Sequence, residues 1–431
     1  SCSTYDNEAW VKTAYNDSKD TEQVKVCVGA DLSVTKTATT SYARDYQWKI
    51  AKKLANDTLE TPAGAPATAA YTVTVSKDGW TDSAWTLTGT ITVANPNTWQ
   101  DVIVDITDSV DIGGGAVCTV VGGAAVSVPR SDSVTVDYSC TFTGQPAYTG
   151  TNTATATWNG AQAHTASSSD DGTAGVSYGD PATETHRTIT VTDTPAGGDT
   201  VTLGTLNYLT APDSTDYTYS AQFAGVAGTC TDYDNTAEIT ETSQSASATV
   251  TVCVGSDLTV EKTAAGGFTR TYLWTIDKSV VDDSITVPAG TNASVDYRVR
   301  VSPDGYADSA QALGGTITVS NPNDWQDISA RVTDVVDIAG VTCTITEALP
   351  VSVPQSGSVT LHYSCTGDYA GDYAGTNTAT ANWDAAAANT PTGTANGSAG
   401  FTMAQTSVNQ SVMVTDTPAG GSTVTLGTAD W

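Results

Sequence analysis

The sequence predicts an all-β chain of tandem β-sandwiches, and three observations support this fold class. Runs such as residues 71–75 and 133–138 alternate apolar with polar side chains, which is the period-two pattern of half-buried strands. Gly, Pro, Asn and Asp interrupt such runs every ~8–15 residues, as turns do between short strands. No segment carries the 3.6-residue apolar stripe of an amphipathic helix.

An internal repeat decides the domain organisation. Residues 31–38 (DLSVTKTA) return as residues 257–264 (DLTVEKTA). Residues 89–100 (GTITVANPNTWQ) return as residues 315–326 (GTITVSNPNDWQ). The period is about 225 residues, which is longer than a typical single β-domain. Each period therefore holds a larger and a smaller module.

Short strands at this spacing, with one cysteine pair per module, predict immunoglobulin-like sandwiches arranged in tandem as an elongated rod. One small module is split between the two ends of the chain. The expected segments are 1–27, a terminal hairpin of the split small module (the donor); 28–176, a large sandwich; 177–253, a small sandwich; 254–400, a second large sandwich; and 401–431, the first strands of the split small module (the acceptor).

Four motifs in the second period follow one another in a characteristic order. They are DLTVEKTA, NPNDWQDI with a following VTDVVDI, a cysteine pair around SVTLHYSC, and GTNTATANW. In this order the chain resembles the Thr-rich immunoglobulin-like repeats of large prokaryotic surface proteins. The resemblance implies the fold and a cell-surface location. Members of that group occur in adhesins, sheaths and filaments, so the resemblance does not choose among these functions.

The eight cysteines are expected to form four disulfides. They are even in number, each pair brackets neighbouring strands, and neither a CxxC-type metal cluster nor a thiol with a nearby histidine is present. Disulfides of this kind are typical of an oxidising compartment, so an extracellular location is expected. The expected pairs are Cys2–Cys27, Cys118–Cys140, Cys230–Cys253 and Cys343–Cys365.

Charge and composition restrict the partners. Acidic residues outnumber basic ones by 47 to 17, giving a net charge of −30, and no basic cluster is available to bind the phosphates of a nucleic acid. No apolar run approaches the roughly 20 residues of a membrane helix, so no membrane span is expected. The three histidines, His164, His186 and His362, do not recur between copies, and no GxSxG elbow is present. We expect no enzymatic activity.

A Thr–Asp pair ends a predicted strand four times. Clustered carboxylates at a domain junction would suit a calcium ion, the one cofactor that the composition suggests. No DxDxDG-type loop is present, so we favour turns in which the carboxylate accepts backbone N–H groups, and no cofactor. The pairs end at Asp108, Asp193, Asp334 and Asp416, and the further acidic residues nearby are Asp105, Asp111 and Asp337.

Lys36 and Lys262 lie on the first strands of the large modules, and Asn152 and Asn377 lie on late strands. Surface pili of related architecture often join such a pair by an isopeptide cross-link, which requires a buried acid beside it. The small module keeps the asparagine, as Asn235, without an evident first-strand lysine. We therefore favour a turn role for these asparagines.

The repeat is cut at both ends of the sequence. Residues 414–428 repeat residues 191–205 with one substitution, and residues 2–27 match residues 230–253. We expect each end to supply what the other lacks, so that copies of the chain join head to tail by β-strand complementation into an extracellular, pilus-like filament. The residues expected at the joint are Cys2, Tyr5, Trp10, Val24, Val26, Val414, Val424 and Leu426.

Two other functions stay open. One is an adhesin stalk or carbohydrate-binding rod, in which exposed Trp80, Trp85 and Tyr306 would stack on glycans. The other is that the sequence is a fragment of a longer covalent repeat protein. N-glycosylation sequons occur in polar stretches, and their asparagines are Asn16, Asn56, Asn292, Asn396 and Asn409.

Overall fold

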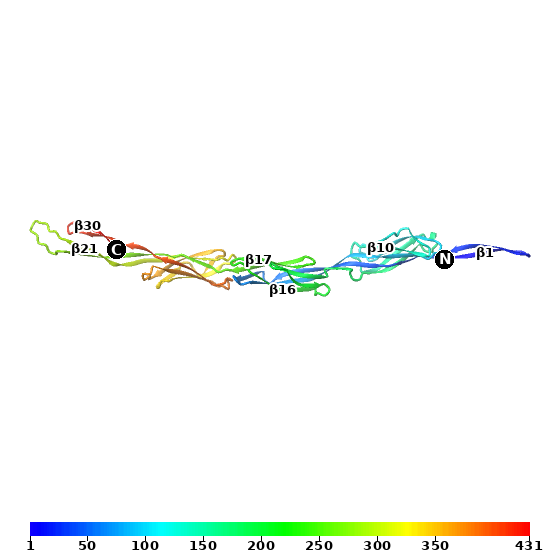
Figure 1. The fold of residues 1–431 in the computed structure, drawn as a ribbon, viewed down its shortest axis with the longest axis horizontal. Coiled ribbons are helices and arrows are strands. Elements are labelled where there is room, and N and C mark those ends of the chain that lie inside the picture. The colour runs from blue at the N-terminus through cyan, green and yellow to red at the C-terminus, as the bar shows by residue number, and fades with distance from the viewer. The chain divides into compact units, whose positions relative to one another are not determined.

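The computed structural model describes residues 1–431 and confirms the all-β class, with thirty strands, β1–β30, and one short helix, α1 (Figure 1). No helix has the length and apolar character that crossing a membrane requires. The chain divides into two compact units, which are described separately. Unit 1 holds Ser1–Lys53, Thr72–Thr218 and Asn235–Ser247, and unit 2 holds Leu54–Tyr71, Tyr219–Asp234 and Ala248–Trp431.

The elements up to the end of the first period are β1 (Cys2–Lys12), β2 (Asp17–Cys27), β3 (Ser33–Lys36), β4 (Thr39–Leu54), β5 (Thr58–Pro62), β6 (Ala67–Asn95), β7 (Val102–Val110), β8 (Val117–Val120), β9 (Val126–Val128), β10 (Asp132–Thr141), β11 (Thr149–Trp158), α1 (Gly160–Ala163), β12 (Ser169–Ser177), β13 (Thr183–Thr185), β14 (Thr188–Pro195), β15 (Val201–Asn207), β16 (Ser214–Phe223), β17 (Cys230–Ile239) and β18 (Gln244–Gly255). The remaining elements are β19 (Thr259–Lys262), β20 (Ala265–Val280), β21 (Tyr297–Ser320), β22 (Ile328–Val336), β23 (Val341–Ile345), β24 (Val351–Val353), β25 (Ser358–Gly367), β26 (Ala374–Asn382), β27 (Thr394–Thr402), β28 (Ala404–Val408), β29 (Ser411–Asp416) and β30 (Val424–Asp430).

Two sheets enclose the main core of unit 1. One has the strand order β13–β4–β6–β10–β8, with β3 and β16 also on β6, and the other has the order β12–β11–β7–β9. The period-two pattern explains the core. In β6 every second residue from Ile91 to Asn95 is buried, and these side chains meet those of β7 and β11. The resulting core includes Leu32, Ile91, Val104 and Ala156.

Unit 2 repeats this arrangement. Its first sheet has the order β23–β25–β21–β20–β28 with β19 on β21, and its second has the order β24–β22–β26–β27. The core between them includes Ile317, Val332, Leu361 and Ala381. The register repeats as well, because Cys343 faces Cys365 as Cys118 faces Cys140.

The strands of the predicted small module fall into both units. In unit 1, β14 pairs with β15 on one side and with β17 on the other. In unit 2, β18 pairs in parallel with β5, and a second core contains Tyr71, Phe223, Val250 and Val252. The segment 177–253 therefore stays a prediction as a single domain, as do the other module boundaries.

Four disulfides join Cys2 to Cys27, Cys118 to Cys140, Cys230 to Cys253 and Cys343 to Cys365, and no cysteine is free. These are the pairs that the spacing predicts. The Cα atoms of each pair are 3.9–4.0 Å apart, because the two cysteines lie on neighbouring strands.

In the repeated NPN motif, the second asparagine side chain hydrogen-bonds to the backbone of a distant segment. In unit 1 the Asn97 side chain accepts a hydrogen bond from the Ala30 N–H and donates one to the Ala30 carbonyl, both at 2.8 Å. Asn95 holds Asn97 in place by accepting from its backbone and side-chain nitrogens, each at 3.0 Å. In unit 2 the Asn323 side chain likewise accepts a hydrogen bond from the Ser256 N–H and donates one to the Ser256 carbonyl. The motif thus fixes the segments that lead into β3 and β19.

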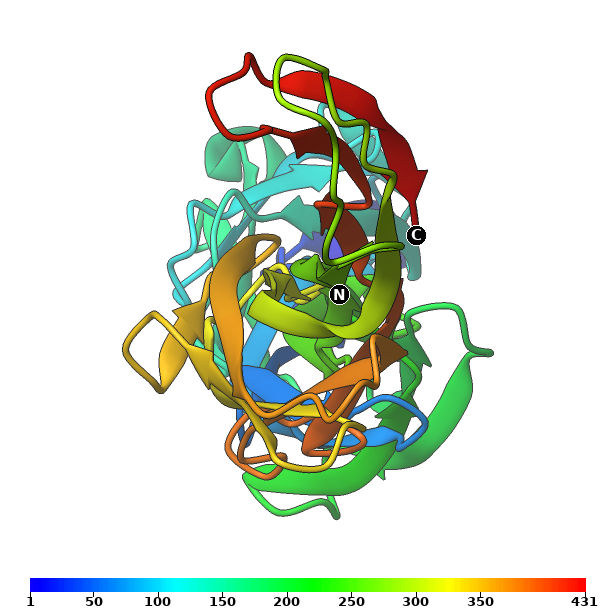
Figure 2. The same cartoon turned by 90° about the vertical axis from the view of Figure 1, so that its left-hand side faces the viewer.

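Two hairpins form sheets of their own. The β1–β2 hairpin belongs to unit 1, and the β29–β30 hairpin belongs to unit 2. Ten of the eleven residues of β1 are exposed, although the strand carries Tyr5, Trp10 and Val11. Figure 2 shows the β29–β30 hairpin (red) and the loop between β20 and β21 (yellow-green) on the side facing the viewer. Both hairpins expose apolar side chains that strands of a closed sandwich would bury.

Candidate functional site: lysine–aspartate–asparagine clusters and two exposed hairpins

A buried ion pair lies inside the large sandwich of unit 1. Lys36, at the end of β3, points its Nζ at Oδ1 of Asp108 on β7, at 2.5 Å, and both side chains are 0% exposed. The Tyr138 ring covers the ammonium, with its centroid 3.1 Å from Nζ. Two full charges in a dry core cost several kcal/mol each unless they are well paired. Such a pair is therefore an unusual feature for a stable β-sandwich.

The same pair recurs in unit 2. Lys262 on β19 lies 2.7 Å from Oδ1 of Asp334 on β22, again with both side chains 0% exposed. Tyr363 covers this lysine, with its ring centroid 3.4 Å from Nζ.

A third pair, in unit 1, joins β4 to β14. Lys52 on β4 forms an ion pair with Asp193 on β14, and both side chains are buried. A fourth pair, in unit 2, joins Lys278 on β20 to Asp416 on β29 at 2.5 Å, but here the side chains are 38% and 21% exposed.

An asparagine accompanies each of the three buried pairs at one fixed register position. Ala154 faces Asp108, and Asn152 precedes Ala154 by two residues, so it lies on the same face of the sheet. Ala379 and Asn377 stand in the same relation to Asp334, as do Ala237 and Asn235 to Asp193. The three asparagines are 0% exposed.

In the Lys262 cluster a direct contact places the asparagine amide beside its aspartate. In unit 2, Nδ2 of Asn377 donates to Oδ2 of Asp334 at 3.1 Å, so the two oxygens of one carboxylate contact the Asn377 and Lys262 nitrogens separately. The amide oxygens Oδ1 of Asn152 and of Asn377 are buried without a hydrogen-bond partner. Unpaired buried carbonyl oxygens of this kind require an explanation.

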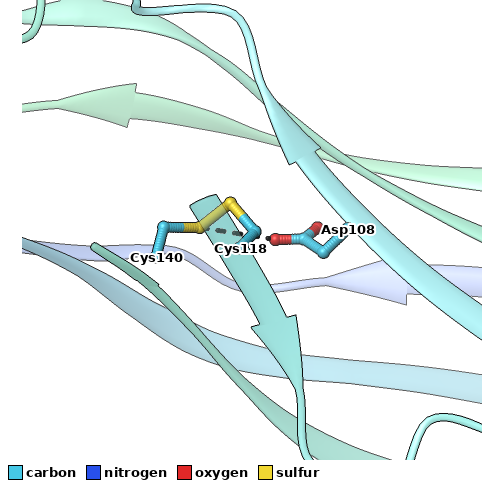
Figure 3. A group of neighbouring side chains, drawn as sticks. All are labelled: Asp108, Cys118 and Cys140. Atoms are coloured by element: carbon cyan, nitrogen blue, oxygen red, sulfur yellow. Dashed lines mark hydrogen bonds between the residues drawn. A yellow bond between two sulfur atoms is a disulfide. The ribbon is translucent and has the colours of Figure 1, made fainter. Parts of the chain in front are cut away.

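A disulfide forms one wall of each large-module cluster. Oδ2 of Asp108 lies 3.7 Å from Sγ of Cys140, and Nδ2 of Asn152 lies 3.7 Å from the same sulfur. Figure 3 shows the Asp108 carboxylate pointing at the Cys118–Cys140 bond. Asp108 with these two cysteines has the spacing of a metal site, as does the equivalent trio of unit 2. Thiolate ligands are not available there, because the sulfurs are bonded to each other.

Burial sets the protonation of these groups. Desolvation lowers the pKa of Lys36, Lys52 and Lys262 below the ordinary lysine value of 10.5, although the hydrogen bond and charge of the aspartate oppose it. Burial also raises the pKa of Tyr138 and Tyr363 to about 12. The covering phenols therefore stay neutral at physiological pH, and the buried amines are easier to deprotonate than surface lysines.

The aspartates of the four Thr–Asp pairs form ion pairs with lysines, which differs from the turn role that the sequence favoured. Asp108, Asp193 and Asp334 lie within strands and are paired with buried lysines, and Asp416 ends β29 and is paired with Lys278. Backbone N–H groups are accepted instead by three neighbouring acids, Asp105 within β7 and Asp111 and Asp337 just after β7 and β22. Their donors are Ala125, Thr151 and Thr376, at 2.6–2.9 Å.

The sequence contains a signal for these clusters that composition alone does not reveal. Lys36 and Lys262 each precede their aspartate by 72 residues. Lys52 returns as Lys278, but it lies at the end of a large-module strand, β4, and not on a first strand of the small module. No first-strand lysine accompanies Asn235, as the sequence indicated, and the lysine that pairs with Asp193 comes from β4 instead.

The residues expected at the joint fall on both faces of the exposed hairpins. Tyr5, Val24 and Val26 share one face of the β1–β2 hairpin, since Tyr5 pairs with Val24 and Ser3 with Val26. Trp10 lies on the opposite face, where it contacts Glu8, Lys12 and Lys19. Of the remaining residues, Cys2 is held in its disulfide, Val414 is half-buried in β29, and Val424 and Leu426 are exposed on β30.

The aromatic residues considered for glycan binding divide into two groups. Trp80 and Tyr306 are exposed. Trp85 is buried, which contradicts the expectation, because it stacks on Tyr42 at 4.6 Å and meets Tyr148 and Tyr178 edge-on. Trp48 is buried, whereas its counterpart Trp274 is half-buried. The five sequon asparagines, at 16, 56, 292, 396 and 409, are all exposed.

No protein-family model matches this chain, and no curated protein matches it either.

Proposed function

We propose that the chain is the structural subunit of an extracellular prokaryotic filament. In this filament the β1–β2 hairpin of one copy completes the β29–β30 sheet of the next copy, and the module at the joint is an immunoglobulin-like sandwich shared by two chains. The observation that carries the proposal is a difference in burial between equivalent residues. Positions that are buried in β14, β17 and β18 are exposed or half-buried in β29, β1 and β2.

The donor hairpin repeats β17 and β18. With Cys2 aligned on Cys230, the exposed face of β1 presents the counterparts of residues that are 0% exposed in β17. Asn7, Ala9 and Val11 correspond to Asn235, Ala237 and Ile239. On β2, Val24 and Val26 correspond to Val250 and Val252, which are core residues in unit 2. Trp10 corresponds to exposed Glu238 and is expected to stay outside the joint.

The acceptor repeats β14 and β15. In β14, Val191 is fully buried and faces Ile239 of β17. Its counterpart in β29, Val414, has β30 on one side and no strand on the other. The register of β14 with β17, carried over to the joint, pairs Val414 with Val11, Asp416 with Ala9 and Pro418 with Asn7 of the next copy.

A second strand pairing supports the same joint. In unit 2 the strand β5 pairs in parallel with β18. Residues 284–288 (SITVP) are the counterpart of β5 (TLETP), but they form no strand, and Ile285 and Val287 are exposed. Since β2 is the counterpart of β18, it would supply the missing neighbour for residues 284–288.

The energetics favour such a joint. Burying a valine or tyrosine side chain contributes about 1.5–3 kcal/mol, and the joint would bury several of them. Main-chain hydrogen bonds would extend the acceptor sheet at the same time. Dissociation would require opening the whole shared sandwich, so the joint should be kinetically stable. A heterologous contact of this type adds subunits without closing on itself, which produces a fibre.

The location follows from chemistry rather than from the joint. Four disulfides in one chain are typical of an oxidising compartment. The net charge of −30 gives a strongly hydrated surface that does not suit nucleic acid. These features support a place outside the cell, at its surface.

An adhesin stalk is the second candidate. Trp80 and Tyr306 stand at equivalent positions of the two periods, and both are about half exposed. Each already has an arginine over its ring, Arg44 at 4.7 Å and Arg270 at 3.8 Å, so only the remaining face is available to a sugar. Glycan-array binding by a monodisperse monomer, lost in Trp80→Ala and Tyr306→Ala, would favour this function over the filament.

The test of the filament uses two matched substitutions on one strand. Val11→Lys places a charge on the face of β1 that would enter the acceptor, and Trp10→Lys places the same charge on the other face. We expect filaments in the electron microscope for the unmodified chain and for Trp10→Lys, and monomers by light scattering for Val11→Lys. Filaments of normal repeat from Val11→Lys, or a monomeric unmodified chain at high concentration, would contradict the donor role. A polypeptide mass above that of residues 1–431 would indicate a longer covalent chain.

A further inference from the structure

We propose that the buried lysines and asparagines are joined by self-formed isopeptide bonds: Lys36 to Asn152, Lys52 to Asn235 and Lys262 to Asn377, with Asp108, Asp193 and Asp334 as the respective acid–base groups. A fourth bond joins Lys278 to Asn7 of the next copy, beside Asp416. The fourth bond rests on the proposed filament, whereas the three internal bonds do not.

The geometry of the Lys262 cluster carries the inference. A single carboxylate, Asp334, contacts the nitrogen that would attack and the nitrogen that would leave. Its Oδ1 lies 2.7 Å from Nζ of Lys262, and its Oδ2 lies 3.1 Å from Nδ2 of Asn377. General acid–base catalysis requires this arrangement, in which one group accepts a proton at the first nitrogen and delivers it at the second.

The reaction balances without a cofactor. Asp334 takes a proton from the Lys262 ammonium, and the neutral Nζ attacks Cγ of Asn377 to form the new C–N bond. The Cγ–Nδ2 bond then breaks, and proton transfer through Asp334 releases Nδ2 as ammonia. Lys–NH₃⁺, Asp–COO⁻ and Asn–CONH₂ thus become an amide, a neutral carboxylic acid and NH₃. Nothing is oxidised or reduced.

The surroundings favour both the reaction and its product. The lysine and aspartate side chains are 0% exposed, and a tyrosine ring and a disulfide close the site, so water does not compete. The reaction removes a buried ion pair, which is costly in a dry core, and leaves neutral groups. The neutral aspartic acid then has an O–H to donate to the new amide oxygen, which comes from the Oδ1 atom that is now unpaired in Asn152 and Asn377.

A purely structural ion pair would explain fewer of these observations than an isopeptide bond does. It accounts for Lys36 with Asp108 but not for a buried asparagine at the same register position in three clusters. The cluster recurs where the sequence around it differs, since Lys52 comes from β4 and Lys36 from β3. The three sites share a lysine, an asparagine and an aspartate, which are the two reactants and the acid–base group of the proposed reaction.

The fourth cluster contains the lysine and the aspartate but no asparagine. Lys278 and Asp416 form an ion pair and are partly exposed. In the intact arrangement the asparagine comes from β17, and the counterpart of Asn235 in the β1–β2 hairpin is Asn7. The register that places Ala9 opposite Asp416 places Asn7 two residues away, as Asn235 is from Ala237. Docking of the donor would therefore complete the site and join the two copies covalently.

The first test is the intact mass of the reduced, denatured monomeric variant Val11→Lys. We expect a mass lower than the sequence mass by three molecules of ammonia, and branched peptides joining the three named pairs. Asp334→Asn keeps the shape but removes the acid–base group, so its mass should fall by only two. Lys49→Ala, at an exposed ion pair, is the control and should still lose three. A full sequence mass with free Lys36, Lys52 and Lys262 would overturn the internal bonds, and thermal melting of each variant shows that it is folded.

The second test is boiling the filaments of the unmodified chain in detergent and reductant. We expect a ladder of covalent multimers, and filaments that instead separate into monomers for Lys278→Arg and for Asn7→Ala. Filaments of the unmodified chain that dissociate completely would overturn the fourth bond while leaving the filament intact. Absence of any filament would overturn the fourth bond and the proposed function together, and the monomer mass would still decide the three internal bonds.

Discussion

Tyr71 and Tyr297 occupy equivalent positions in the two periods, yet Tyr71 is 1% exposed and Tyr297 is 56% exposed. Tyr71 stacks on Tyr219 with ring centroids 5.5 Å apart, inside the core that includes Val250 and Val252. Two chemically identical side chains thus differ only in whether neighbouring strands cover them. The exposed apolar side chains of Ile285, Val287 and Tyr297 therefore mark the part of unit 2 that no strand covers.

The first prediction concerns amide exchange at this surface. In the monomeric Val11→Lys variant, residues 281–297 have few backbone hydrogen bonds and should exchange within seconds to minutes. In filaments they should be protected, because strand pairing removes their N–H groups from water. Residues 58–62, which already pair with β18, should be protected in both states and serve as the internal control. Equal exchange of residues 281–297 in both states would contradict a joint at this position.

The second prediction concerns an acid-sensitive ion pair. Asp82 accepts hydrogen bonds from Arg44 at 2.7 and 2.8 Å and a further one from the Tyr148 hydroxyl. The Arg44 hydrogen bond is the main cause that lowers the pKa of Asp82 below its ordinary 3.8. Because the folded pKa is the lower one, the pair stabilises the fold above pH 3.8, and this contribution disappears as the pH falls through the folded pKa.

Asp82→Asn should therefore lower the free energy of unfolding by about 1–3 kcal/mol at neutral pH, and by progressively less below pH 3.8. Denaturant titration across this pH range measures the difference. Asp78→Asn is the matched control, since its pair with Lys49 is exposed and should contribute at most about 1 kcal/mol. A difference that stays constant down to acidic pH would show that the Asp82 charge is not responsible.

The sequence predicted the strand content, the repeat and the four disulfides, because each depends on local pattern or on spacing. It named the lysines and asparagines of the Lys36 and Lys262 clusters, but it did not pair them with their aspartates and it missed Lys52. Lys52 and Asp193 are 141 residues apart and meet only because the fold brings the end of β4 against β14. Trp85 was misjudged for a related reason. Its three aromatic neighbours come from distant segments, and their arrangement depends on the folded sheets rather than on any local periodicity.

The third prediction concerns the acidic surface. With a net charge of −30, filaments should repel one another laterally at low salt. Millimolar calcium or magnesium should promote bundling by screening and by bridging carboxylates, and the onset should shift when 0.15 M NaCl shortens the screening length to about 8 Å. Light scattering in the presence and absence of a chelator measures this. Scattering that does not respond to either divalent ion would contradict an electrostatic barrier to bundling.

The last prediction concerns the disulfide beside the Lys36 cluster. Cys118 and Cys140 close a loop with a sequence separation of 22, and their removal should cost about 3 kcal/mol on the chain-entropy estimate. Replacing both by alanine also removes the sulfur that contacts Asp108 and Asn152, so water can enter. In the monomeric Val11→Lys background we therefore expect this variant to lose two molecules of ammonia instead of three, or to lose the third more slowly after refolding. The matched control is the alanine pair at Cys2 and Cys27, which closes a loop of similar separation in the exposed β1–β2 hairpin. If both variants lose three molecules of ammonia at the same rate, the Cys118–Cys140 bond contributes to stability but not to the chemistry of the cluster.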